Sequence, residues 1–159
     1  MESDDHIKNL GILIASLQSF ELSIRVHLSY QPNNVNSQNK DDIYTLPVGA
    51  KVIESDITNF KNLCELIKEF NKEAKFEKRD EIDLQIIRVR DALAHGRVFT
   101  REKKFPLRLI KFSKPRSGNV YIDYSEEMSE MWFKNQIGLV NKAIEIVLNA
   151  TNGDIFKRY

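Results

Sequence analysis

The sequence predicts a mainly all-α fold, a bundle of four to five helices that a β-hairpin interrupts. Three observations favour it. Four long stretches place apolar residues at three- and four-residue spacing, residues 97–124 change to a strand-like pattern, and no segment repeats. With 159 residues, one domain can bury roughly two-thirds of the surface that the unfolded chain exposes. We therefore expect a single domain over residues 1–159.

The first three helices follow from apolar periodicity. Residues 5–30 carry one apolar stripe that includes Ile14, and a long polar loop is expected over residues 31–55. The second helix is predicted over residues 56–74. Cys64 lies inside its apolar stripe, so we expect a core cysteine rather than a nucleophile. The third helix is predicted over residues 80–95, where Gly96 supplies a natural stop.

A hairpin is expected between the third helix and the last one. Residues 107–112 and 120–124 are rich in β-branched and aromatic side chains, and Ser117, Gly118 and Asn119 form a turn between them. Two or three strands are therefore expected over about 97–124. The last helix is predicted to begin near Ser125 or Ser129 and to end near Ala150. Its apolar residues cover more than one face, and a homodimer would bury the second face.

Basic residues are concentrated in the hairpin. The whole chain carries 24 Lys and Arg against 23 Asp and Glu, yet between Arg97 and Arg116 eight basic residues stand against Glu102 alone. This local charge of +7 favours an anionic partner, although a solvated hairpin would show the same pattern. If that partner is RNA, the residues expected to bind it are Arg97, Arg101, Lys103, Lys104, Arg108 and Lys111. The aromatic residues that would stack on unpaired bases, or simply pack, are Phe105, Phe112, Tyr121 and Tyr124.

Several classes of protein are excluded by what the sequence lacks. No apolar run approaches the ~18 residues of a membrane span, and the first residues are acidic, unlike a signal peptide. A single cysteine excludes an internal disulfide and a cysteine-cluster zinc site. The histidines lack metal-ligand spacing, and no glycine-rich phosphate loop occurs. We expect a cytoplasmic protein with no metal, no cofactor and no membrane partner.

The segment with the most evident chemistry is residues 88–96. On an ideal helix Arg88, Asp91 and His95 share a stripe opposite the core face. Four residues separate Asp91 from His95, so the carboxylate can orient the imidazole. A histidine that exchanges protons near neutral pH, beside guanidinium groups that hold phosphate, suits phosphodiester chemistry.

Two charged residues fall where apolar side chains are expected. Glu21 interrupts the stripe of the first helix, and Arg90 lies at the border of the core face of the third. Buried charges are seldom left unpaired. We therefore predict that Glu21 and Arg90 pair, with Arg25 in the same cluster. The alternative is that Glu21 extends to the edge of its helix.

The segment Arg90-Asp-Ala-Leu-Ala-His95 resembles the R-x(4–6)-H motif of the HEPN superfamily (higher eukaryotes and prokaryotes nucleotide-binding domains). Arg88 with His95 also satisfies the motif. The resemblance implies a HEPN-like helical domain and a metal-independent endoribonuclease that acts as a homodimer. His95 would be the general acid or base, Arg90 would hold the scissile phosphate with Arg88 assisting or substituting, and Asp91 would orient His95. Arg90 and His95, however, lie ~140° apart on an ideal helix.

Function remains open among three classes. The resemblance favours an RNA-cleaving enzyme, such as a toxin or antiphage defence protein with an antitoxin or other protein partner. Some members of the superfamily lack nuclease activity, so a silent module that binds nucleotide, nucleic acid or protein is the alternative. The third class is an unrelated helical interaction domain in which His95 merely ends a helix.

Overall fold

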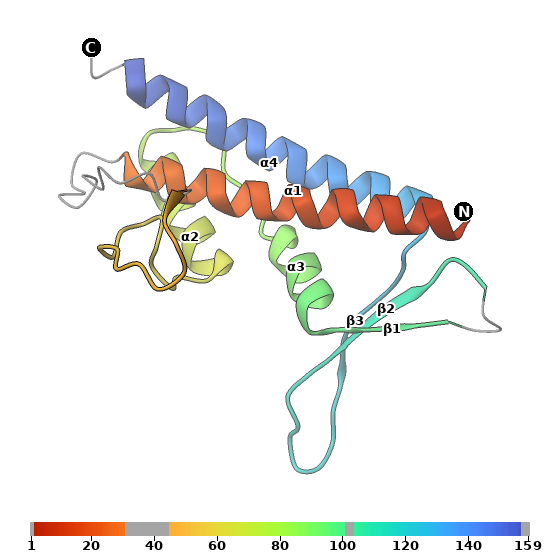
Figure 1. Cartoon of the computed structure of the whole chain (residues 1–159). Helices are drawn as coiled ribbons and strands as arrows, with labels where there is room; N and C mark the ends of the chain where they lie inside the picture. Colours follow the sequence, from red (N-terminus) through yellow and green to blue (C-terminus); the bar gives the residue numbers. More distant parts are fainter. Residues whose placement is uncertain (1, 31–44, 101–103, 157–159) are drawn as a thin grey trace. The chain divides into compact units, whose positions relative to one another are not determined.

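The structure, a computed structural model, describes residues 2–30, 45–100 and 104–156. Four helices and three strands lie in this part of the chain (Figure 1). In order they are α1 (Ser3–Ser29), α2 (Leu63–Phe76), α3 (Gln85–His95), β1 (Arg97–Phe99), β2 (Arg108–Phe112), β3 (Ile122–Glu127) and α4 (Glu130–Phe156). The prediction of a mainly helical fold with a small sheet before the last helix is confirmed. None of the helices described is long and apolar enough to span a bilayer.

The chain divides into two compact units. The first contains Met1–Phe20 and Asp83–Ala143, and the second contains Glu21–Ile82 and Ile144–Tyr159. Each of the long helices α1 and α4 therefore contributes its first part to one unit and its last part to the other. That all of residues 1–159 form one domain stays a prediction.

The core of the first unit is formed by side chains from its helices and from the sheet. Its fully buried apolar residues include Leu13 and Phe20 of α1, Ala92 of α3, Leu109 of β2 and Phe133 of α4. Burying one large apolar side chain contributes on the order of 1.5–3 kcal/mol, so these contacts dominate the stability of the unit. The apolar stripe predicted for the first helix was wrong at Ile14, which is 43% exposed.

The sheet is antiparallel, in the order β1-β2-β3. Between β2 and β3, Arg116 pairs with Asn119, and both residues between them have positive φ, 50° at Ser117 and 79° at Gly118. Positive φ at both central residues defines the tight turn that matches strand twist. The predicted turn is confirmed, and the strands differ from the predicted ranges by one or two residues at their starts and by three at the end of β3.

One face of the sheet packs into the core of the first unit. Leu109 and Tyr124 are buried there, and the Tyr124 hydroxyl accepts a hydrogen bond from Nε1 of Trp132 at 3.1 Å. Burial raises the pKa of the Tyr124 phenol. Tyr124 is therefore a packing residue, which is the second of the two roles that the sequence left open for it.

Helix α2 begins later than the sequence pattern predicted. Ile57 and Phe60 are exposed, and the helix starts at Leu63 after a reciprocal cap. Asn62 accepts the backbone N–H of Glu65 at 3.1 Å, and the Glu65 carboxylate accepts the backbone N–H of Asn62 at 2.8 Å. Cys64, expected in the core, is only half-buried.

The segment before α2 is held out of the helix by Arg25. Its guanidinium donates to the backbone carbonyl oxygens of Asp56 at 3.2 Å, Asn59 at 3.1 Å and Lys61 at 2.7 Å. Carbonyls that bind a side chain in this way are diverted from helical hydrogen bonds. A contact from a distant part of the sequence therefore overrides the apolar periodicity of residues 56–62.

The remaining helix ends also have local causes. Asn71 pairs with both backbone groups of Ile82, at 2.8 and 2.9 Å, so α3 begins at Gln85 rather than at residue 80. The hydroxyl of Ser129 accepts the backbone N–H of Trp132 at 3.2 Å, which selects Ser129 over Ser125 as the start of the last helix. That helix continues to Phe156, beyond the predicted end near Ala150.

Two histidines that the sequence did not single out are buried. In the second unit, His27 contacts Thr151 Oγ1 at 3.0 Å through Nδ1 and Glu73 Oε1 at 3.3 Å through Nε2. In the first unit, His6 lies against the rings of Phe105 and Phe133, with centroids 5.2 and 5.3 Å away. The Nδ1 atom of His6 is buried without a hydrogen-bond partner among the described residues.

We predict that His6 makes the stability of the protein depend on pH. Burial lowers its pKa below the ordinary value of 6.5, so the folded state binds its proton less readily than the unfolded state does. Above 6.5 the group is neutral in both states. As pH falls below 6.5 the unfolded state gains the proton first, and the free energy of unfolding decreases until the folded pKa is passed.

Urea unfolding between pH 7.5 and 5 measures this effect. The His6→Phe variant should lose less stability over that range than the wild type loses. His95→Gln, which removes an exposed histidine, is the control and should retain the wild-type slope. Equal slopes for the wild type and His6→Phe would contradict the prediction.

Candidate functional site

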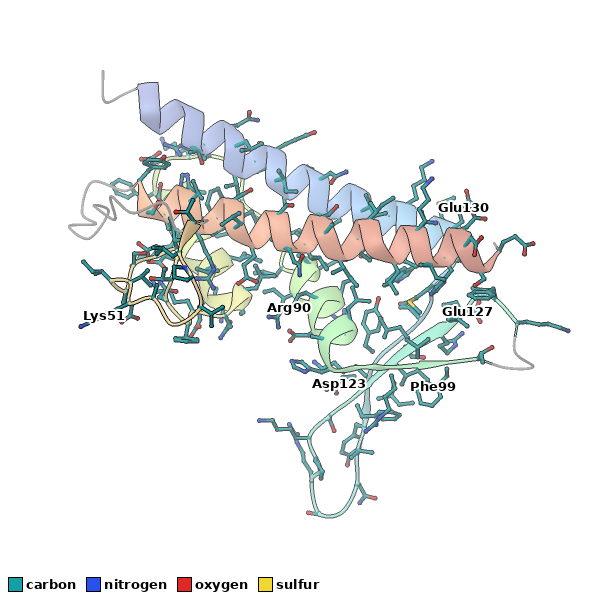
Figure 2. The ribbon with its side chains drawn as sticks, viewed as in Figure 1. Lys51, Arg90, Phe99, Asp123, Glu127 and Glu130 are labelled. Atoms are coloured by element: carbon teal, nitrogen blue, oxygen red, sulfur yellow. The ribbon has the colours of Figure 1, made fainter. Side chains whose placement is uncertain are left out.

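The predicted motif lies on α3, which stays helical through His95. The backbone N–H of Gly96 donates to the carbonyl of Ala92 at 2.7 Å, so the last turn is closed. Arg88 and His95 are seven residues apart, about 20° around the helix, whereas Arg90 and His95 are ~140° apart. Within one chain the arginine that shares the face of His95 is therefore Arg88. Arg90, which is labelled in Figure 2, lies on another side of α3.

His95 and Arg88 are both exposed. In the part of the chain that the structure describes, the His95 imidazole has no hydrogen-bond or ion-pair partner. It lies at the C-terminus of α3. An accessible imidazole and an accessible guanidinium on one helix face can contact the same phosphodiester strand.

Asp91 is engaged by two cations. Its Oδ1 lies 3.2 Å from Nη1 of Arg90, and its Oδ2 lies 3.8 Å from Nζ of Lys111 on β2. No hydrogen bond between Asp91 and His95 is found among the described residues. The sequence predicted that Asp91 would contact His95, but β2 brings Lys111 to the Asp91 carboxylate instead. Among the described residues of a single chain, no contact between Asp91 and His95 supports the predicted orienting role of Asp91.

Glu21 and Arg25 form an ion pair in the second unit. Oε1 of Glu21 lies 3.0 Å from Nη2 of Arg25, one helical turn apart. Together with the carbonyl contacts of Arg25, this pair supports the segment before α2. The predicted pairing of Glu21 with Arg90 would join residues of different units, and it stays a prediction.

The basic residues of the hairpin differ in their surroundings. Arg108 pairs with Glu127 at 2.9 Å and donates to the Ser125 hydroxyl at 3.1 Å. Lys111 pairs with Asp91, and the Arg97 guanidinium lies over the Phe112 ring, 5.6 Å from its centroid. The charges of Arg108 and Lys111 are therefore partly neutralised by carboxylates.

The predicted RNA-binding set also includes Lys104, Arg101 and Lys103. Lys104 is exposed, at the start of the segment that leads into β2. Arg101 and Lys103 lie outside the described residues. The sequence reasoning missed Phe99, which is 43% exposed beside a hollow of the sheet. Its signal was the strand alternation of residues 97–99, which places Phe99 on the same face as Arg97.

Comparisons of the chain with protein-family models, with curated proteins and with solved structures found no match. Across the described residues, no group of three or more His, Cys, Asp and Glu side chains is placed to hold a metal ion. The candidate site therefore rests on the geometry of α3 and the sheet.

The joint between α3 and β2 requires glycine at position 96. A Cβ atom there would overlap the carbonyl oxygen of Ala92, and it would approach the carbonyl of Ile110 and the side chain of Leu109 to 3.0 Å. The φ of Gly96 is −78°, which any residue adopts. The stop predicted at Gly96 is confirmed, but its cause is close backbone approach rather than a left-handed cap.

We predict that Gly96→Ala destabilises the protein by about 1–3 kcal/mol, because backbone atoms must move to admit the methyl group. Gly11→Ala and Gly138→Ala are matched controls. Both sites are exposed helical positions with nothing near an added Cβ, so each substitution should stabilise by up to ~1 kcal/mol. Urea unfolding measures all three. A Gly96→Ala variant as stable as the controls would contradict the close approach.

Proposed function

We propose that this chain is a metal-independent endoribonuclease of the HEPN type that acts as a homodimer. The observation that carries the proposal is the exposed His95 at the end of α3, with exposed Arg88 on the same helix face. An imidazole supplies acid–base chemistry near neutral pH, and a guanidinium binds phosphate oxygens. The basic residues of the adjoining sheet favour an RNA substrate.

The proposed reaction is an internal transfer. A neutral His95 accepts the proton of a ribose 2′-OH, and the 2′-oxygen attacks the adjacent phosphorus. The bond from phosphorus to the 5′-oxygen breaks, and a protonated His95 donates a proton to that oxygen. The products are a 2′,3′-cyclic phosphate and a 5′-hydroxyl. One step needs a base and the other an acid, which is why two copies of His95, one from each protomer, suit the mechanism.

The arginines divide the phosphate contacts. Arg88 would act on the same strand as His95 of its own chain, because the two side chains share a face. Arg90 lies ~140° away, so it would reach the phosphate at the partner's histidine, after release from Asp91. The additional negative charge of the transition state makes such cation contacts stronger than in the ground state.

One observation favours a second candidate, a catalytically silent HEPN-type module that binds nucleotide, nucleic acid or protein. Asp91 contacts Arg90 and Lys111, and the His95 imidazole thus lacks the carboxylate that would orient a catalytic base. A binding module has no need of that contact. The cleavage experiment below separates the two functions.

We predict that the protein cleaves single-stranded RNA in EDTA, leaving a 2′,3′-cyclic phosphate. His95→Ala should lower the rate by on the order of 10²- to 10⁴-fold, because proton transfer is lost. Arg88→Ala and Arg90→Ala should each slow cleavage, and the larger loss identifies the principal phosphate ligand. Lys72→Ala, an exposed position on α2, is the matched control and should cleave like the wild type.

The cleavage assay has clear contrary results. Cleavage that survives in His95→Ala would remove the histidine from the mechanism, and no cleavage at any protein concentration would favour the binding module. Light scattering on the same samples should give twice the mass of the chain. A monomer would contradict the shared active site.

The biological role that fits this activity is a cytoplasmic toxin or antiphage defence protein, held in check by an antitoxin or another protein partner. We predict that overexpression slows growth and that His95→Ala relieves the effect. Growth curves with matched expression levels measure it. Equal growth of cells that express the wild type or the variant would contradict the toxin role.

A further inference from the structure

The outer face of the sheet carries a hollow of ≈ 630 Å³. It lies entirely within the first unit and takes residues from all three strands, together with Thr100 and residues 104–106. Phe99, Phe105, Arg108, Ile110, Ser125 and Glu127 are among the residues that line it. Figure 2 labels Phe99 on β1 and Glu127 on β3.

Strand register explains why these side chains share one face. Phe99, Arg108 and Glu127 form one row across the sheet, because Phe99 pairs with Arg108 and Arg108 pairs with Glu127. Ile110 and Ser125 belong to the next row on the same face. Leu109, which lies between these rows on β2, points to the core. The lining therefore follows directly from the pairing of the strands.

The lining combines an aromatic surface with an oriented cation. Phe99 is 43% exposed, and its ring supplies an apolar face beside Ile110. The guanidinium of Arg108 is held by Glu127 at 2.9 Å and by Ser125 at 3.1 Å, so it is positioned before any ligand arrives. On the same face, the Arg97 guanidinium lies over the Phe112 ring, 5.6 Å from its centroid, and offers a second stacking surface.

We infer that this hollow binds an unpaired nucleobase of a single-stranded RNA, an assignment that rests on the proposed ribonuclease function. A base in a duplex hides its aromatic face, whereas an unpaired base can stack on an aromatic side chain inside a concave site. Arg108 would contact the phosphate next to the base, and the Glu127 carboxylate would accept a base N–H. The basic residues of the sheet match the charge of the RNA backbone.

The hollow is also close to the proposed chemistry along the chain. Phe99 follows His95 by four residues, and the intervening β1 is extended, so their backbones are separated by about 13 Å at most. A strand of a few nucleotides spans that distance. The site would thus favour particular bases near the cleaved bond, within a few nucleotides of it.

Binding can be measured without cleavage by using the full-length His95→Ala protein. The probe is a fluorescein-labelled ten-nucleotide oligoadenylate, and fluorescence anisotropy gives its Kd. Phe99→Ala should weaken binding roughly 10- to 100-fold, because one stacking contact is lost. Val98→Ala is the matched control, since Val98 is the neighbouring exposed residue on the opposite strand face, and it should change the Kd by less than about twofold.

Phe99→Trp provides a direct signal from the site. It retains an aromatic surface, so its Kd should stay near that of the parent, and the new tryptophan should lose fluorescence when a base stacks on it. The parent protein contains only the buried Trp132, 7% exposed, and should show little change. Agreement of both readings supports the site.

Three results would overturn it. They are equal affinity of the parent and Phe99→Ala, equal affinity for an abasic strand of the same length, and no binding of any single strand. These outcomes are separate from the fate of the nuclease proposal. If the protein never cleaves RNA but binds it in a way that depends on Phe99, the ribonuclease proposal fails and the base-binding site stands.

Discussion

The arrangement of the first unit depends on the close approach of two backbones at Gly96. There the Ala92 carbonyl of α3 and the Ile110 carbonyl and Leu109 side chain of β2 leave no room for a side chain. Because the joint is this short, α3 ends abruptly and β1 begins two residues after His95, with only Gly96 between them. A helix end that carries an imidazole is thereby joined to an edge strand of the sheet through Gly96 alone, so the candidate catalytic residue lies four residues before Phe99.

The surface around the basic segment of residues 97–116 is less uniformly positive than the sequence of that segment indicates. The described part of residues 97–116 contains six basic residues and no acid, but folding brings carboxylates to Lys111 and Arg108, which are among them. Asp91 and Glu127 come from α3 and β3, outside the basic segment. An RNA strand would therefore meet a surface of specific, oriented groups rather than a uniform positive field, and contact geometry should matter as much as net charge.

Helix periodicity predicted part of the candidate site but not the contacts that other elements make with it. Arithmetic on residues 88–95 places Arg88 and His95 on one face, and α3 retains that geometry because it is regular to its last residue. The same arithmetic suggested that Asp91 would orient His95, since side chains four residues apart are neighbours. It could not include Lys111, which reaches Asp91 only through the packing of β2 on α3. A neighbour from another element competes with a neighbour on the same helix, and sequence spacing does not reveal it.

By itself the sequence determined the mainly helical class, the position of the hairpin, its tight turn and the end of α3, because propensity, periodicity and turn chemistry act over a few residues. Tertiary structure decided the late start of α2, where Arg25 of α1 captures three carbonyls that would otherwise enter a helix. It also decided the burial of His6 between two phenylalanine rings and the hollow beside Phe99. These features arise when side chains distant in the sequence meet, and their free energies outweigh the local preferences that a pattern of residues records.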